Sequence, residues 1–238
     1  MYTPSRIRAI YTHSYAEIYE SLYLVPWPNK HRHNIANINR ILSNLPIEGR
    51  RWLDVCCGQA WHFSQFFGAT KKFGLDISLA QLHRAKRRNP NAAFIQCDAL
   101  APSFGDGLFD LVTSFWGAYC YLDNENFIGE FVDNTIAWTR PGGTVYLELL
   151  LPEMLQSFND SAFAGKSQFR VVALTQDFRR WSYSDCGGEH LMTSPPLSFF
   201  LSRFNTLFRD VTVEYDNGFM HHFVASGKVD STAEHPVS

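Results

Sequence analysis

The sequence has little net charge and no long apolar run, and each absence restricts what the protein can do. The 238 residues carry a formal net charge of −2, and only 18% of them are charged. Such a chain has no strong positive field to attract a phosphate backbone. No stretch approaches the roughly 18 uncharged apolar residues that span a bilayer, and no apolar signal segment opens the chain. We therefore expect a cytoplasmic protein with no nucleic-acid and no membrane partner.

Two motifs with known chemistry are also missing. The five cysteines occur without the C-x-x-C pairs of zinc sites. We expect reduced, mostly buried thiols and no metal. The G-x-G-x-x-G fingerprint is absent, which argues against an oxidoreductase that binds a dinucleotide.

Between residues 51 and 150, short β-rich runs alternate with helical patterns, as in a parallel sheet with crossover helices. The predicted strands are Arg51–Val55, Lys72–Leu75, Ala93–Cys97, Phe109–Phe115 and Gly143–Leu150. The clearest helices are expected to begin near Ala60, Ser78 and Asp123, with Ser78 and Asp123 as caps.

The hydrophobic content of 45% is enough for one sizeable core, so we expect residues 1–238 to form one domain. Residues 1–48 are predicted to form a helical lid in which Tyr15, Tyr19 and Tyr23 share one face. Residues 152–193 would form a substrate insertion, 195–228 a final helix and hairpin, and 229–238 a loose tail.

Carboxylates follow the first three predicted strands. Asp54 precedes the tight turn Cys56–Gly58, and a helix is expected directly after that turn. Asp76 and Asp98 end the next two strands. The carboxyl ends of parallel strands are where open α/β folds bind ligands, and an acidic residue there can accept hydrogen bonds from ribose hydroxyls. Because buried carboxylates need partners, Asp76 and Asp98 are the strongest candidates for ligand contacts.

The segments "LDVCCGQA", "GLDIS", "CDA", "FDLV" and "RPGG" occur in order. Together they resemble the class I S-adenosylmethionine-dependent methyltransferases. "Y-x-E-I-Y-x-x-L-Y" before this block and "HLMTSPPLSFFLSRF" after it are similar to small-molecule N-methyltransferases. The likeness is greatest to the nucleotide-aminosugar N,N-dimethyltransferases and more distant to glycine N-methyltransferase.

This resemblance implies a fold, a cofactor and site residues. The fold would be α/β and Rossmann-like, a seven-stranded mostly parallel sheet with flanking helices, an antiparallel last strand and a small insertion after strand five. The cofactor would be S-adenosyl-L-methionine. Its expected binding residues are Asp54, Cys56, Gly58, Asp76, Ile77, Asp98, Ala99, Ser114 and Phe115.

The sequence departs from the family's glycine-rich turn, because Cys56 and Ala60 stand where the family has glycine. Both side chains are small, but a positive φ is harder for them than for glycine. This difference leaves open a binding module that holds the cofactor without turnover.

Methyl transfer from a sulfonium depends mainly on alignment and on exclusion of water. We expect a small-molecule metabolite as acceptor, with nitrogen as first choice and a hydroxyl or carboxylate oxygen as the alternative. A protein or nucleic-acid acceptor is disfavoured because "SFWG" stands where an Asn-Pro-Pro-aromatic motif would indicate amide or base methylation. Tyr23, Tyr121 and Glu148 are the catalytic candidates. Further polar candidates are His62, Tyr119, His190 and His221. The oligomeric state stays open.

Overall fold

The computed structural model describes residues 2–68, 70–101, 104–166, 168, 170–174 and 178–230. Its centre is a seven-stranded sheet in the order β3-β2-β1-β4-β5-β10-β9. Its strands are β1 (Arg51–Val55), β2 (Lys71–Asp76), β3 (Ala93–Gln96), β4 (Phe109–Ser114), β5 (Thr139–Leu149), β9 (Phe208–Tyr215) and β10 (His221–Lys228). The first five are parallel, and β10 is antiparallel to β5 and β9. The predicted α/β fold class is thereby confirmed.

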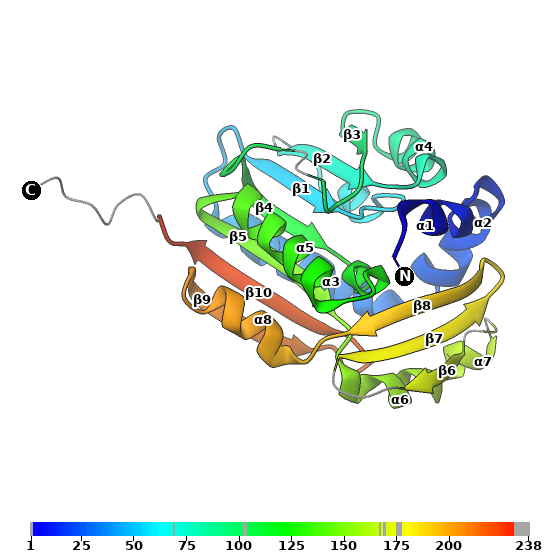
Figure 1. Cartoon of the computed structure of the whole chain (residues 1–238). Helices are drawn as coiled ribbons and strands as arrows, with labels where there is room; N and C mark the ends of the chain where they lie inside the picture. Colours follow the sequence, from blue (N-terminus) through cyan, green and yellow to red (C-terminus); the bar gives the residue numbers. More distant parts are fainter. Residues whose placement is uncertain are drawn as a thin grey trace, which may run out of the picture.

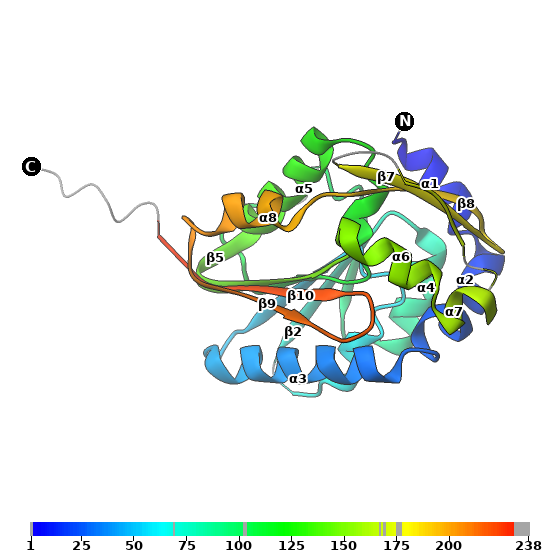
Figure 2. The same cartoon turned by 90° about the horizontal axis from the view of Figure 1, so that it is seen from below.

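Helices lie on both faces of this sheet (Figures 1 and 2): α3 lies on one face, and α5 and α8 lie on the other. The helices are α1 (Pro4–Ile10), α2 (His13–Tyr19), α3 (Pro28–Asn44), α4 (Leu79–Arg88), α5 (Glu125–Trp138), α6 (Leu155–Asn159), α7 (Ala162–Lys166) and α8 (Leu197–Phe204). Shorter turns are the π-helical η1 (Glu20–Leu24) and the 3-10 turns η2 (His62–Gln65), η3 (Ala118–Tyr121) and η4 (Pro152–Met154).

Side chains alternate between two apolar layers because successive residues of a strand face opposite sides of the sheet. In β1, Trp52 packs in the layer under α3, whereas Leu53 packs in the layer under α5. Tyr146 and Leu147 of β5 divide in the same way. The strands are therefore buried on both sides, as parallel strands between helices require.

The helix that the sequence predicts from Ala60 does not form. The segment makes only the 3-10 turn η2, so the prediction of a long helix directly after the first turn is wrong. Side chains from other segments donate hydrogen bonds to the backbone carbonyls that an α-helix would pair with its own amides. Asn89 donates to the Ala60 carbonyl at 2.9 Å, and Lys72 donates to the carbonyls of Phe63 and Phe66.

The cap predictions have a mixed outcome. Ser78 is the N-cap of α4, as expected, and its hydroxyl accepts from the amide of Gln81. The cap of α5 is Asn124 rather than Asp123. The N-terminal region is helical but interrupted, since η1 and the bend before Trp27 separate α2 from α3.

Residues after β5 form a second, three-stranded sheet in the order β6-β7-β8, with antiparallel pairs. Its strands are β6 (Val171–Leu174), β7 (Arg179–Asp185) and β8 (Gly188–Ser194). Figure 1 shows β7 and β8 beside the N-terminal helices α1 and α2. The predicted helical lid and the predicted substrate insertion are therefore neighbours. Most of the predicted tail, residues 231–238, lies outside the described residues.

Within the described part of the chain, no helix is long and apolar enough to cross a membrane. The same residues contain no cluster of three or more histidine, cysteine and acidic side chains that could hold a metal ion.

The Ser78 cap gives a stability prediction. Its hydroxyl accepts from the Gln81 amide at 3.3 Å and donates to the Tyr11 carbonyl at 2.8 Å, so it ties α4 to the N-terminal segment. Ser78→Ala should lower the free energy of unfolding by about 1–2 kcal/mol, measured by urea denaturation. Ser43→Ala, which removes an exposed hydroxyl within α3, serves as the control and should stay within about 0.5 kcal/mol. Equal losses in the two variants would contradict the linking role of Ser78.

Candidate functional site

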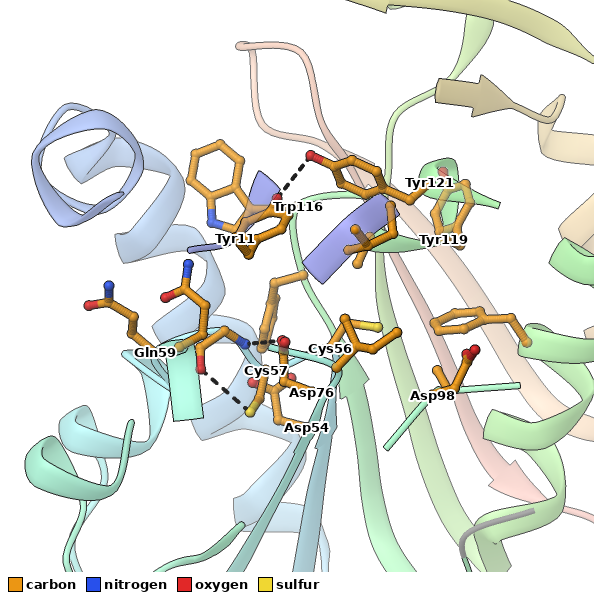
Figure 3. A pocket seen from close by; sticks show the side chains of 18 of the residues that line it. Tyr11, Asp54, Cys56, Cys57, Gln59, Asp76, Asp98, Trp116, Tyr119 and Tyr121 are labelled. Atoms are coloured by element: carbon orange, nitrogen blue, oxygen red, sulfur yellow. Dashed lines mark hydrogen bonds between the residues drawn. The ribbon is translucent and has the colours of Figure 1, made fainter. Parts of the chain in front are cut away.

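A pocket lies at the carboxyl ends of β1, β2 and β3 and encloses about 1030 Å³ including its open mouth. Figure 3 shows Asp54, Asp76, Asp98 and Cys56 on one side of it, opposite a group of aromatic side chains. Eight of the nine predicted cofactor residues line it, namely Asp54, Cys56, Gly58, Asp76, Ile77, Asp98, Ala99 and Phe115. Ser114 does not line the pocket, and its buried hydroxyl has no hydrogen-bond partner in the part of the chain that the structure describes.

Asp76 organises the turn after β1. Its carboxylate accepts from the backbone amides of Gly58 and Ser78, each at 2.8 Å. Burial raises the pKa of Asp76 to about 6, against the opposing effect of these amides. Burial likewise raises the pKa of Asp54 to about 8, although the Thr113 hydroxyl donates to it at 2.7 Å.

The turn keeps the backbone conformation of a glycine-rich loop despite its substitutions. Cys56 has φ 56° and Ala60 has φ 48°, so both residues adopt the left-handed region that favours glycine. Gly58 between them has φ 52°. The replacement of two glycines therefore leaves local strain in the turn, but it does not change the path of the chain.

Asp98 is engaged by the N-terminus of the described chain. The Tyr2 hydroxyl donates to the carboxylate, at 2.9 Å from each oxygen. The Tyr2 amide bonds to Asp123, and the Tyr2 ring contacts Phe127 edge-on. Tyr2 also lines the pocket. It was not anticipated from the sequence, where nothing marks it out.

Gln81 is a second unanticipated residue of the pocket. It is 1% exposed and lines the cavity, yet neither its amide nitrogen nor its amide oxygen has a hydrogen-bond partner among the described residues. Buried amides are normally paired, so these atoms are suited to a polar ligand.

The aromatic wall is formed mainly by Tyr11, Tyr19, Trp116, Tyr119 and Tyr121. Tyr11 and Tyr121 point toward each other (Figure 3), with 2.9 Å between their hydroxyl oxygens. Burial raises the pKa of both phenols well above the usual value, so they stay protonated at neutral pH. The sequence held a signal for Tyr11, because it precedes Tyr15 at the same spacing of four as Tyr19 and Tyr23.

Trp116 has φ 61°, an uncommon conformation for a bulky residue. Its amide donates to Glu148 at 2.6 Å, and the Lys30 ammonium lies 3.8 Å from the centre of its ring. Lys30 and Glu148 form a buried ion pair at 2.7 Å. These contacts hold Trp116 at the pocket wall in a strained conformation, which is typical of functional sites.

The three catalytic candidates lie at different depths. Tyr121 lines the pocket. Tyr23 lies outside the lining set, and its hydroxyl donates to Asp185 at 2.7 Å. Glu148 lies behind the wall, paired with Lys30 and the Trp116 amide. Burial raises the pKa of Glu148, but the charge of Lys30 and these hydrogen bonds bring it below its usual value.

The remaining polar candidates also differ in position. His62 lines the pocket, where burial lowers its pKa well below the usual value, and it contacts Asn34 at 3.1 Å. Tyr119 lines the pocket, and its hydroxyl oxygen accepts from the Leu150 amide at 3.0 Å. His190 and His221 lie outside the lining set.

The comparisons with known proteins agree with this geometry. Residues 53–143 match the family model of a methyltransferase domain. A demethylmenaquinone methyltransferase from Renibacterium salmoninarum is 30% identical over 156 residues, which are 58% of this chain and 63% of that protein. A phthiotriol/phenolphthiotriol dimycocerosates methyltransferase from Mycobacterium ulcerans is 29% identical over 51% of this chain and 45% of its own length. The chain thus spans less than two thirds of these relatives.

Solved structures extend the likeness over nearly the whole chain. DesVI from Streptomyces venezuelae is 25% identical with a TM-score of 0.62, covering 89% of this chain and 98% of its own. CalS10, an amino pentose methyltransferase from Micromonospora echinaspora, has a TM-score of 0.61 at 22% identity, covering 87% and 96%. The chain therefore resembles the S-adenosylmethionine-dependent methyltransferases in sequence over residues 53–143 and in fold over nearly its whole length. Its structural neighbours within that class include sugar N-methyltransferases, as the sequence resemblance implied.

Gly58 allows a test of the turn. A Cβ built there meets nothing within 4 Å, but φ is positive, and the added side chain would occupy space beside the pocket. Gly58→Val should lower the free energy of unfolding by about 1–3 kcal/mol and weaken S-adenosylmethionine binding at least tenfold (about 1.4 kcal/mol), measured by calorimetry.

Gly49→Val is the matched control. Gly49 also has positive φ and open space around its Cβ position, but it precedes β1 at the opposite edge of the sheet. It should lose similar stability and keep its cofactor affinity. Normal binding by folded Gly58→Val would place the cofactor elsewhere.

Proposed function

We propose that the protein transfers a methyl group from S-adenosylmethionine to a nitrogen atom of a small-molecule acceptor. The observation that carries the proposal is a single pocket with carboxylates at one end and protonated phenols at the other. Two segments, the N-terminal helices and the β7–β8 hairpin, adjoin its phenolic end.

The carboxylate end suits a cationic ligand. Asp54, Asp76 and Asp98 line it, and no lysine or arginine is among the described residues of the lining. A sulfonium cofactor would offset the charge of those carboxylates that are ionised, whereas a phosphate would be repelled. We assign Asp76 to the ribose hydroxyls and Asp98 to the adenine amino group.

The neighbouring residues complete this assignment. Ile77 and Ala99 would flank the adenine, the turn Cys56–Gly58 with Asp54 would hold the methionine part, and the free amide of Gln81 would bond to the nucleoside. Because Tyr2 now donates to both Asp98 oxygens, cofactor binding would require its hydroxyl to move aside or to share this carboxylate.

The phenolic end favours an amine over a hydroxyl acceptor. A hydroxyl usually needs a strong base, whereas a protonated amine loses its extra proton far more readily and needs only a weak one. The phenols Tyr11 and Tyr121 stay protonated at neutral pH, and burial holds His62 neutral and weakly basic. Sugar N-methyltransferases among the structural neighbours support the same choice.

The reading as a non-catalytic binding module loses support, since Cys56 and Ala60 adopt the left-handed conformations of the glycines they replace. A role in small-molecule biosynthesis follows from the proposed acceptor. All five cysteines are free thiols, which is consistent with a reducing compartment such as the cytoplasm.

An acceptor panel tests the proposal. The purified protein is incubated with S-adenosylmethionine and an amino sugar, its nucleotide derivative, glycine, a phenol or a carboxylic acid, and S-adenosylhomocysteine is measured. We expect turnover with an amine. Turnover should be faster with acceptors that place no phosphate in the pocket. Turnover confined to the phenol or the acid would overturn nitrogen as the acceptor. Cofactor binding without any turnover would support a binding module.

The pKa of Asp76 predicts the pH dependence of cofactor binding. The ribose hydroxyls donate to the ionised carboxylate, and this form is lost as pH falls through about 6. The dissociation constant at pH 5 should therefore be about tenfold higher than at pH 7. Asp54, with a pKa raised to about 8, is largely protonated throughout this range and does not add to the change.

Calorimetry at pH 5, 6 and 7 checks this expectation. Asp76→Asn is the control and should bind weakly with a flat profile, because the amide does not titrate. A wild-type dissociation constant that stays level between pH 7 and pH 5 rules out the ribose contact.

A further inference from the structure

A line of hydrogen bonds runs from the second sheet to the pocket. Asp185, at the end of β7, contacts Nε2 of His190 through Oδ1 at 2.8 Å. Nδ1 of His190 on β8 contacts the Tyr121 hydroxyl at 2.6 Å. Tyr121, in η3, lines the pocket, whereas Asp185 and His190 do not. Asp185 and His190 are thus placed to act on a ligand only through Tyr121.

The hydrogen bonds to Asp185 determine which groups of this line donate protons and which accept them. Its Oδ2 accepts from the hydroxyls of Tyr15 at 2.6 Å and Tyr23 at 2.7 Å, and its Oδ1 also accepts from the Gly187 amide at 2.7 Å. Burial raises the pKa of Asp185, but His190 and the two tyrosine hydroxyls bring it below its usual value. The carboxylate is therefore ionised and can only accept.

The tautomer of His190 follows from this. Nε2 must carry a proton toward Asp185, so in the neutral ring Nδ1 is an acceptor and the Tyr121 hydroxyl donates to it. The imidazole is fully buried and stacks on the Tyr183 ring at 4.2 Å, which prevents it from turning away. The lone pairs of the Tyr121 oxygen are left for its other neighbours.

These neighbours are two hydroxyls, one of which a pocket ligand would displace to reach the Tyr121 oxygen. The Tyr121 oxygen lies 2.9 Å from the Tyr11 hydroxyl and 3.1 Å from that of Tyr183. The titratable groups that face His190 from the surrounding elements are Tyr11, Tyr15, Tyr23, Tyr121, Tyr183 and Asp185. All but Asp185 are phenols, so Asp185 is the one anion among these groups.

We propose that Asp185, His190 and Tyr121 form a proton relay that deprotonates the acceptor amine before methyl transfer. This inference rests on the proposed function. Tyr121 is the catalytic residue, and His190 and Asp185 are positioning residues that act through it. An acceptor ammonium bound against the Tyr121 oxygen gives that oxygen a proton, while the Tyr121 proton passes to Nδ1 of His190.

The protein's own side chains account for every proton that moves in this step. One N–H bond of the ammonium and the original Tyr121 O–H bond break, while a new O–H bond forms on Tyr121 and an N–H bond forms on His190. The amine becomes neutral, and the imidazolium is stabilised by the Asp185 carboxylate, as in other His–carboxylate pairs. The freed lone pair then forms the N–CH₃ bond, and the electrons of the breaking S–CH₃ bond neutralise the sulfonium.

The tautomer can be tested without any substrate. In long-range ¹H–¹⁵N spectra of protein labelled with ¹⁵N-histidine, His190 should carry its proton on Nε2 and none on Nδ1 at neutral pH. His190→Gln assigns the signals. Asp185→Asn should abolish this preference, because an amide can donate as well as accept. A proton found on Nδ1 of neutral His190 contradicts the relay.

Kinetics test the step itself, with the free amino sugar of the panel as acceptor. Tyr121→Phe and His190→Gln should lower kcat/KM about 100-fold at pH 7, the range expected for one proton transfer. The defect should shrink about tenfold per pH unit as pH rises toward the pKa of the amine, because a neutral amine needs no relay. Cofactor affinity, measured by calorimetry, should stay within twofold.

His83→Gln, the same change at an exposed histidine outside the network, is the matched control and should behave as wild type. A defect that is equal at every pH assigns the network to structure alone, and wild-type kinetics in both variants also overturn the relay. If wild type methylates only a hydroxyl or carboxylate, the proposed acceptor class fails. The spectra and the same variants on that acceptor then decide the relay separately.

Discussion

The carboxylate of Asp76 is the interaction on which the geometry of the site depends. It accepts from the Gly58 amide in the turn after β1 and from the Ser78 amide at the start of α4. Ser78 in turn donates to the Tyr11 carbonyl in the N-terminal segment. One buried charge therefore joins two strand ends, the beginning of a helix and the segment that carries part of the aromatic wall. Because this carboxylate is desolvated, its pKa is raised. A cationic ligand nearby would stabilise the ionised form that burial disfavours.

Charge also distinguishes the two ends of the pocket. Carboxylates at the strand ends create a negative surface that suits a sulfonium and a nucleoside. The phenols opposite are neutral, yet they can donate and accept hydrogen bonds without competing for the positive charge. In the proposed reaction, a methyl group would move from sulfur in the first environment to an amine in the second. The reaction's requirement for little water agrees with the aromatic wall.

Local sequence patterns predicted most of what lies along β1 to β5. The apolar runs predicted the strands, and strand-end positions predicted the lining residues Asp54, Asp76 and Asp98, because parallel strands bring their carboxyl ends to one edge. The failure at Ala60 has a non-local cause. Carbonyls of that segment are bonded by the side chains of Lys72 and Asn89, which arrive from β2 and from the end of α4.

The contacts that sequence reasoning missed also join residues that are far apart in the chain. Tyr2 reaches Asp98 across 96 positions of the chain, and Asp185 meets Tyr15 across 170. No periodicity within a helix or strand encodes such pairs. Tyr11 differs, since its spacing from Tyr15 continues a visible series and the rings are 5.4 Å apart. Extending that series by one turn toward the N-terminus would have found it.

The two segments beside the pocket are joined by charge rather than by apolar contact alone. Asp185 of the hairpin holds Tyr15 and Tyr23 of the N-terminal helices, and Tyr121 contacts Tyr11. Hydrogen bonds to an ionised carboxylate are stronger than those between neutral groups, so separating the segments costs more than breaking ordinary side-chain contacts. A proton that reaches His190 leaves the Asp185 carboxylate facing a cation, which reduces its hold on the two phenols. The proposed relay and the contact between the two segments would then share one group, the Asp185 carboxylate.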